Sequence, residues 1–160
     1  MPRIYPLPPF DRHRRFGPAL LGIGALAALI ACSCPRDAHA AEGARLRLVI
    51  DGAAHGATLA DTAAAQDFAA MLPVSVEMED YAGKEKIAQP PRAIRTEGSA
   101  GGHRPAAGDM TLFAPWGNLA FFYGAAPAHS GLHLLGRMDG GALAAISRPG
   151  VMTVRIEAVE

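Results

Sequence analysis

The chain has 160 residues, of which 50% are apolar and 19% are charged, and its 15 basic side chains balance 15 acidic ones to a formal net charge of +0. This length predicts one domain, and the apolar fraction excludes a disordered protein. Zero net charge argues against nucleic-acid binding, which requires a basic face, and the sequence lacks the successive long apolar runs of a polytopic membrane protein.

Residues 1–40 have the pattern of an export signal peptide with a short linker. Four arginines, the last of them Arg15, precede an uncharged run of mainly Leu, Ile, Ala and Gly over residues 18–32. The arginines are expected to stay on the cytoplasmic side, while the run is long enough to enter the translocon but short for a permanent span. We therefore expect an exported protein.

Two cleavage sites compete in this signal. Residues 29–32, Leu-Ile-Ala-Cys, resemble a lipobox, in which the thiol of Cys32 takes a diacylglycerol and becomes the new N-terminus. Residues 38–40, Ala-His-Ala, are instead typical of an ordinary signal-peptidase site. The first predicts a cell-envelope lipoprotein and the second a periplasmic or secreted protein, with an uncleaved anchor as a third alternative. Contact with a membrane is expected only through a lipid on Cys32.

The body, residues 44–160, predicts a mainly β domain. Alternation over residues 45–50 leads into Asp51-Gly52, a hairpin turn pair, and a second strand around residues 57–59. Asp61 is the expected N-cap of a helix over residues 62–71, with Phe68 on its buried face and Asp67 pointing outward. Further strands are predicted over residues 74–79, 109–114, 118–123, 132–136 and 151–157, and a second short helix over residues 140–147.

Residues 80–108 differ from the rest of the body because Gly, Pro and charged residues dominate them. They predict a long ordered loop with at most one short strand near residues 93–95, and loops of this length are often functional. Elsewhere turn signals recur about every 8–12 residues, which favours a small closed barrel with two short helices.

Four segments of the body resemble the bacterial cyclophilin-like fold proteins. They are TAAAQDFAAML, MEDYAGKEK, Thr96-Glu97-Gly98 and, most specifically, GDMTLFAPWGNLAFFY at residues 108–123. The resemblance covers nearly the whole mature domain and implies a closed β-barrel flanked by two helices. It implies no settled activity, because the family is mostly without assigned function, and members resembling this chain are often exported.

The resemblance raises prolyl isomerisation as an alternative function. True cyclophilins place an arginine, carried in a Phe-His-Arg run, against the prolyl nitrogen, and this sequence lacks that run. Arg92 and Arg95, in the polar loop, are the arginines that could substitute. Isomerisation must lower a barrier of roughly 18–20 kcal/mol, and a single misplaced donor supplies little of that.

Candidate binding residues gather in the loop and at the turn Pro115-Trp116-Gly117. Trp116 is either a stacking platform at a barrel mouth or a plug that closes the barrel end. Tyr81 belongs either to a ligand-binding charged cluster or to a solvated hairpin tip, and Glu97 is expected to pair with a basic loop residue. The predicted binding residues are Tyr81, Lys86, Arg92, Arg95, Glu97 and Trp116.

No cofactor or metal is predicted. His129 and His133 are four residues apart, but Ser130-Gly131 breaks any helix that would align their rings for zinc. No nucleotide-binding or catalytic-triad motif is present. Three classes of function remain: a barrel that binds an unknown small molecule or peptide, an isomerase-like enzyme, and an accessory partner of an envelope or redox protein.

Overall fold

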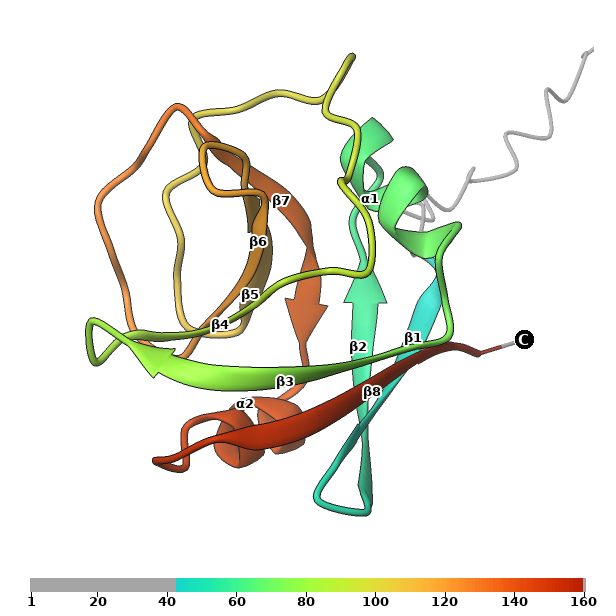
Figure 1. Ribbon diagram of the computed structural model, residues 1–160, viewed down its shortest axis with the longest axis vertical. Coiled ribbons are helices and arrows are strands. Elements are labelled where there is room, and N and C mark those ends of the chain that lie inside the picture. The colour runs from blue at the N-terminus through green and yellow to red at the C-terminus, as the bar shows by residue number, and fades with distance from the viewer. Residues whose placement is uncertain (1–42, 160) are drawn as a thin grey trace, which may run out of the picture. The chain divides into compact units, whose positions relative to one another are not determined.

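Eight antiparallel strands close into a barrel in the computed structural model, which describes residues 43–159 (Figure 1). The strands follow one another around the barrel in the order β1-β2-β7-β5-β6-β4-β3-β8, and β8 pairs with β1 to close it. The predicted mainly β barrel with two short helices is confirmed. The strands are β1 (Arg45–Ile50), β2 (Ala53–Leu59), β3 (Val74–Tyr81), β4 (Glu85–Ala88), β5 (Asp109–Phe113), β6 (Asn118–Phe122), β7 (Leu132–Met138) and β8 (Met152–Ala158).

The predicted export signal, the Cys32 lipobox and the alternative cleavage site lie outside the described residues. Within residues 43–159, no helix has the length and apolar character needed to span a bilayer.

The first hairpin forms as its turn pair predicts. Asp51 and Gly52 both have positive φ, 47° and 83°, which is the backbone of the two-residue turn that suits the twist of paired strands. The second strand begins at Ala53, earlier than expected, and pairs with all of β1.

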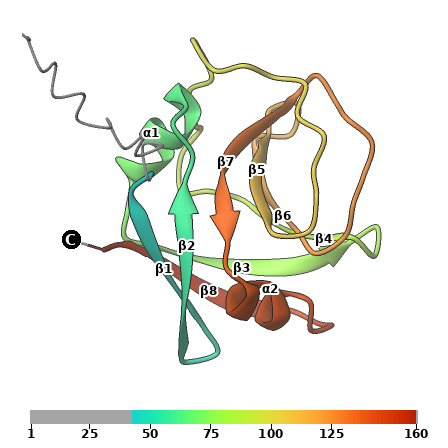
Figure 2. The same ribbon diagram turned by 180° about the vertical axis from the view of Figure 1, so that it is seen from behind.

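Two short helices, α1 (Ala63–Ala69) and α2 (Gly140–Ile146), accompany the barrel (Figure 2). The expected N-cap of α1, Asp61, is wrong. Thr62 takes that position: its Oγ1 accepts a hydrogen bond from the backbone N–H of Ala65 at 3.1 Å and donates one to the carbonyl of Leu134 at 3.0 Å. The second hydrogen bond fastens α1 to β7, and the sequence around Thr62 does not predict this long-range contact.

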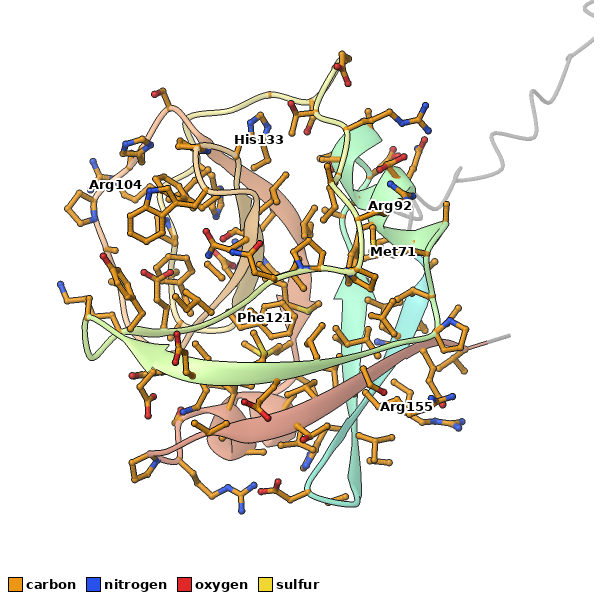
Figure 3. The ribbon with its side chains drawn as sticks, in the orientation of Figure 1. Met71, Arg92, Arg104, Phe121, His133 and Arg155 are labelled. Atoms are coloured by element: carbon orange, nitrogen blue, oxygen red, sulfur yellow. The ribbon has the colours of Figure 1, made fainter. Side chains whose placement is uncertain are left out.

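Alternating side chains of the strands fill the barrel interior, where Figure 3 places Phe121. In β8, Val154 and Ile156 are completely buried while Arg155 between them points to solvent, so the predicted orientation of the closing strand is confirmed. Phe121 and Leu119 of β6 join the same core.

Strand β4 lies inside the segment that was expected to be a loop, and the short strand expected near residues 93–95 is absent from the described structure. A tight turn with positive φ at Ala82 and Gly83 connects β3 to β4. Strand β4 lacks the apolar alternation that predicts a strand, because one of its inward positions is Lys86. Lysine is almost never fully buried unless it is paired.

Candidate functional site

The outer surface of the barrel carries a second apolar cluster where β3, β4 and β6 lie side by side. The strand register places Tyr81 opposite Glu85, and Glu85 opposite Phe122, so the three side chains form one row across the sheet. Every residue of β6 is buried: Leu119 and Phe121 face the core, whereas Ala120 and Phe122 pack on the other face with Leu132. This part of the barrel wall is therefore covered on both sides.

Two connections cover this outer face. The β5–β6 turn brings Trp116 over it, and residues 123–131 bring Ala126 and His129. The second connection is held by backbone hydrogen bonds from the Ala126 N–H to the Pro105 carbonyl and from the His129 N–H to the His103 carbonyl, both 3.3 Å long. Between them and the strands lies a cavity of about 230 Å³, which we call the aromatic pocket. Its walls are Tyr81, Glu85, Ile87, Phe113, Trp116, Asn118, Phe122, Ala126, His129 and Leu132.

The aromatic rings of this pocket brace one another at nearly right angles. Trp116 makes edge-to-face contacts with Tyr81, at 5.6 Å between ring centroids, and with Phe113, at 5.4 Å. Phe113 makes a third such contact with His129, at 4.9 Å. Edge-to-face geometry is the favoured arrangement of aromatic pairs, and it turns the ring faces in different directions, as in the walls of a box.

Trp116 lies at the open side of the aromatic pocket. It is 57% exposed, although a tryptophan is usually well buried. A ring that closed the barrel end would be buried against the core, so the interpretation of Trp116 as a plug is wrong. Its exposed position, supported on two sides by Tyr81 and Phe113, leaves part of the indole free to contact a ligand.

Glu85, Asn118 and His129 are polar side chains that line the pocket beside its aromatic rings. The carboxyl of Glu85 is half-buried, and burial raises its pKa above the ordinary value. The Oδ1 atom of Asn118 is buried and has no hydrogen-bond partner within residues 43–159, while its Nδ2 donates to the carbonyl of Leu119 at 3.0 Å. His129 accepts a hydrogen bond at Nδ1 from the N–H of Gly131, which leaves Nε2 as the protonated nitrogen of the neutral ring.

Lys86, a predicted binding residue, points into the barrel and lines none of the pockets described here. Its side chain is fully buried, and the ammonium donates to Asp80 Oδ1 at 2.7 Å and to the carbonyl of Gly150 at 2.6 Å. The Lys86 ammonium, together with the N–H of Gly150, holds the pKa of Asp80 below its ordinary value. Lys86 therefore ties β4 to the end of the α2–β8 connection, which is a structural role.

Arg92 and Arg95 meet at Asp67, away from the aromatic pocket. Arg92 donates to Asp67 Oδ2 at 2.6 Å, and the Arg95 side chain binds Asp67 Oδ1 at 2.8 Å (Figure 3 shows Arg92 beside α1). The expected outward position of Asp67 is wrong, because these contacts hold it in a buried position. The hydrogen bond from Arg92, with those from Arg95, keeps the pKa of Asp67 far below its ordinary value.

Glu97 does not form the expected salt bridge. Both arginines bind Asp67 instead, and within residues 43–159 no basic side chain lies within ion-pair distance of Glu97. Glu97 lines a second, more polar hollow beside α1 with Gln66, Asp67 and Arg95. The six predicted binding residues therefore separate into three places: Tyr81 and Trp116 in the aromatic pocket, Lys86 in the barrel, and Arg92, Arg95 and Glu97 near α1.

A buried carboxylate fixes the loop beside the aromatic pocket. Asp109 is completely buried and accepts hydrogen bonds at Oδ2 from the N–H of Ala106, at 2.9 Å, and pairs there with His103 Nε2, at 2.7 Å. Arg137 lies 3.3 Å from its other oxygen. Since the His103 carbonyl in turn holds His129, this cluster positions one wall of the pocket.

The sequence places Glu85 with Tyr81 in a charged cluster that could bind a ligand, but it does not identify Phe113, Asn118, Phe122 and His129 as binding residues. One signal was present in the segment LAFF of β6, whose unbroken apolar run indicates a strand that is covered on both faces. Near this wall His103 and Asp109 pair with each other, and His129 accepts a hydrogen bond from a backbone N–H. Within residues 43–159 no group of three or more potential ligands is poised to hold a metal ion.

The chain belongs to the Cyclophilin-like family, whose model matches residues 48–157. Among solved structures, a hypothetical protein from Archaeoglobus fulgidus, determined in solution, is similar with a TM-score of 0.56 and 17% sequence identity over 73% of this chain and 95% of that one. This second similarity supports the fold alone. No curated protein is similar enough to count as a match.

Proposed function

We propose that this chain is an exported cyclophilin-like barrel of the cell envelope that binds a small ligand or a peptide segment in its aromatic pocket. The observation that carries the proposal is the pocket itself, with its exposed Trp116 and two polar groups, Asn118 Oδ1 and the Glu85 carboxylate, that have no polar partner within residues 43–159. A concave, mostly apolar site with a few polar groups is the usual form of a ligand pocket. The pattern of residues 1–40 supports export.

The size of the pocket limits what it can enclose. Pockets that surround a whole drug-sized molecule measure roughly 300–1,000 Å³, and this one measures about 230 Å³. It therefore encloses one group of a larger ligand, such as a ring or a branched side chain, while the rest of the ligand lies along the exposed surface near Trp116.

Prolyl isomerisation receives no specific support from this geometry. The two arginines that could have replaced the cyclophilin arginine are bound to Asp67, and neither lines the aromatic pocket. A binding role is the better supported function, and an isomerase assay on proline-containing peptides is a direct check on the alternative.

Binding is expected to depend on Trp116 and not on Arg95. Trp116→Ala should weaken the binding free energy of a peptide or small ligand by about 1 kcal/mol or more, since aromatic anchors often dominate binding. Arg95→Ala is the matched control, because the side chain is 80% exposed and contacts Asp67 rather than the pocket. Calorimetric titration of both variants, each checked for an unchanged melting temperature, tests this. Equal loss of affinity in the two variants would refute the assignment of the pocket.

Export is tested on the native protein. The mass and N-terminal sequence should show that residues 1–31 or 1–40 are absent, because the basic and apolar segments match a cleaved signal. Cys32→Ala should abolish acyl labelling if residues 29–32 are a lipobox. A mature protein that begins at Met1 or Pro2 in the cytoplasmic fraction would contradict export.

A further inference from the structure

The electrostatic character of the aromatic pocket narrows its ligand further, an inference that rests on the proposed function. Aromatic rings and the carboxylate of Glu85 line the pocket, a buried amide oxygen lies in its wall, and His129 is the single basic side chain among its lining residues. The neighbouring cations Lys84 and Arg104 are exposed and do not line the pocket. Aromatic faces carry partial negative charge, so each of these surfaces favours a positively charged group.

Glu85 is the acidic side chain among the residues that line the pocket. It is half-buried in the row between Tyr81 and Phe122, and within residues 43–159 no Lys or Arg nitrogen forms an ion pair with it. By contrast, Asp67 and Asp109, the acidic groups that are buried, each have a basic partner. A carboxylate that is partly removed from water without a counter-charge gains most from a cation that arrives with the ligand.

Asn118 provides a second, independent indication that the pocket favours a positively charged group. It is only 2% exposed and lies on β6 opposite Phe113, and its Oδ1 is buried without a partner. Buried polar atoms in folded proteins are nearly always hydrogen-bonded, and each exception calls for an explanation. The buried amide oxygen lies in a residue that lines the aromatic pocket, so it adds negative potential to that wall, as Glu85 and the aromatic rings do.

We infer that the aromatic pocket binds an alkylammonium group, a positively charged nitrogen carried on carbon, from a small molecule or a peptide side chain. The rings of Tyr81, Phe113, Trp116 and Phe122 surround the alkyl groups on nitrogen, and Glu85 neutralises the charge. Cages of perpendicular aromatic rings are the usual protein device for such cations, and a bulky, weakly hydrated ammonium loses less solvation on entering than a compact one.

The sharpest test compares two ligands of nearly the same shape. Choline carries a trimethylammonium group, and 3,3-dimethylbutan-1-ol carries a neutral tert-butyl group in its place. In NMR titrations of the purified protein, followed at the indole N–H of Trp116, the sole tryptophan, choline should bind at least about fivefold more tightly, because attraction to the rings and to Glu85 acts only on the charged ligand. Equal or tighter binding of the alcohol would overturn the inference.

The source of the cation is distinguished by a second pair of ligands. A peptide with one trimethyllysine is compared with the same peptide carrying the neutral tert-butyl analogue of that side chain. Tighter binding of the trimethyllysine peptide than of choline identifies a peptide side chain as the source, and the reverse identifies a free small molecule. Equal affinities of the charged and neutral peptides would contradict the inference, as would equal affinities of choline and the alcohol.

Variants test whether the charge of Glu85 is responsible for the preference for choline. Glu85→Gln keeps the size of the side chain, so it should retain the melting temperature and reduce choline affinity about fivefold while leaving the alcohol unchanged. Glu79→Gln is the control, since Glu79 is an exposed carboxylate on neighbouring β3 that lines a different hollow. Equal effects of the two variants would overturn the role of Glu85.

The result also separates this inference from the proposed function. If the alcohol or a neutral peptide shifts the Trp116 signal as strongly as its charged analogue, the pocket binds ligands but has no preference for cations. If no ligand of either charge shifts that signal, the proposed function and this inference both fail.

Discussion

Replacing Ile156 with alanine is expected to lower the free energy of unfolding by about 2–5 kcal/mol. The Ile156 side chain is completely buried in the middle of β8, where it lies opposite Leu48 on one neighbouring strand and Val74 on the other. Removing three methylene or methyl carbons at the seam that closes the barrel leaves a cavity that strands on both sides cannot collapse to fill. Urea unfolding followed by circular dichroism measures the loss.

The control is Arg155, the preceding residue on the same strand. Arg155 points to solvent, and its side chain is 49% exposed. Arg155→Ala removes only a surface ion pair with Glu157, so the change should stay within about 0.5 kcal/mol. Equal denaturant midpoints for Ile156→Ala and Arg155→Ala would show that the register of β8 is wrong.

The second large effect is expected at Lys86. Lys86→Met keeps most of the length of the side chain but removes the ammonium that binds Asp80 and the Gly150 carbonyl inside the barrel wall. We expect a loss of about 2–3 kcal/mol. This is less than the roughly 3–5 kcal/mol found when one partner of a fully buried pair is removed, because Asp80 keeps its bond to the Gly150 N–H and part of its contact with water.

Two comparisons make the Lys86 prediction specific. Lys84→Met, two residues earlier at an exposed position, should leave the midpoint nearly unchanged. The double variant Asp80→Asn with Lys86→Met should cost less than the sum of its parts, since neither residue is then left as an unpaired charge. A Lys86→Met midpoint as high as that of Lys84→Met would show that the buried ion pair contributes nothing to stability.

The acid dependence of this pair follows from the depressed pKa of Asp80. A carboxyl whose pKa is lower in the folded state stabilises the fold above its ordinary pKa of 3.8 and loses that contribution as the pH falls through the folded value. Wild type should therefore lose more stability on acidification than Lys86→Met, in which the folded and unfolded values lie closer together.

The sequence is sufficient to predict the barrel because its pattern is local. Turn pairs such as Asp51-Gly52 specify hairpins by their own backbone preference, and β8 alternates between apolar and charged residues without interruption. These signals lie within a few residues of each other, so no knowledge of distant partners is needed to interpret them.

Long-range partners account for the elements that were missed. Strand β4 has a lysine at an inward position, and only Asp80 and the distant Gly150 carbonyl make that burial possible. The helical periodicity predicts Asp67 on the outer face of α1, but Arg92 and Arg95, more than 20 residues later, bind it. A single sequence does not state which charges will meet, so these positions are assigned to the surface by default.

The candidate site could be predicted only in part, because its other residues come together through long-range contacts. Trp116 and Tyr81 were identified because they are large aromatic residues at a turn and at a strand end, and both line the aromatic pocket. The arginines were included because they are polar residues in a loop, but the cluster at Asp67 holds them. His129 and Phe122 join the pocket through the strand register and the residue 123–131 connection, which are properties of the fold.

The most direct test of the proposed site is a map of amide chemical-shift changes on addition of choline or a binding peptide to the ¹⁵N-labelled protein. We predict the largest shifts at the Trp116 indole and at the backbone amides of Glu85, Phe113, Asn118 and His129, around the aromatic pocket. The amides of α1 and of Arg95, at the second hollow, should stay in place. Shifts centred on Asp67 and Arg95, with the Trp116 signal unmoved, would contradict this prediction.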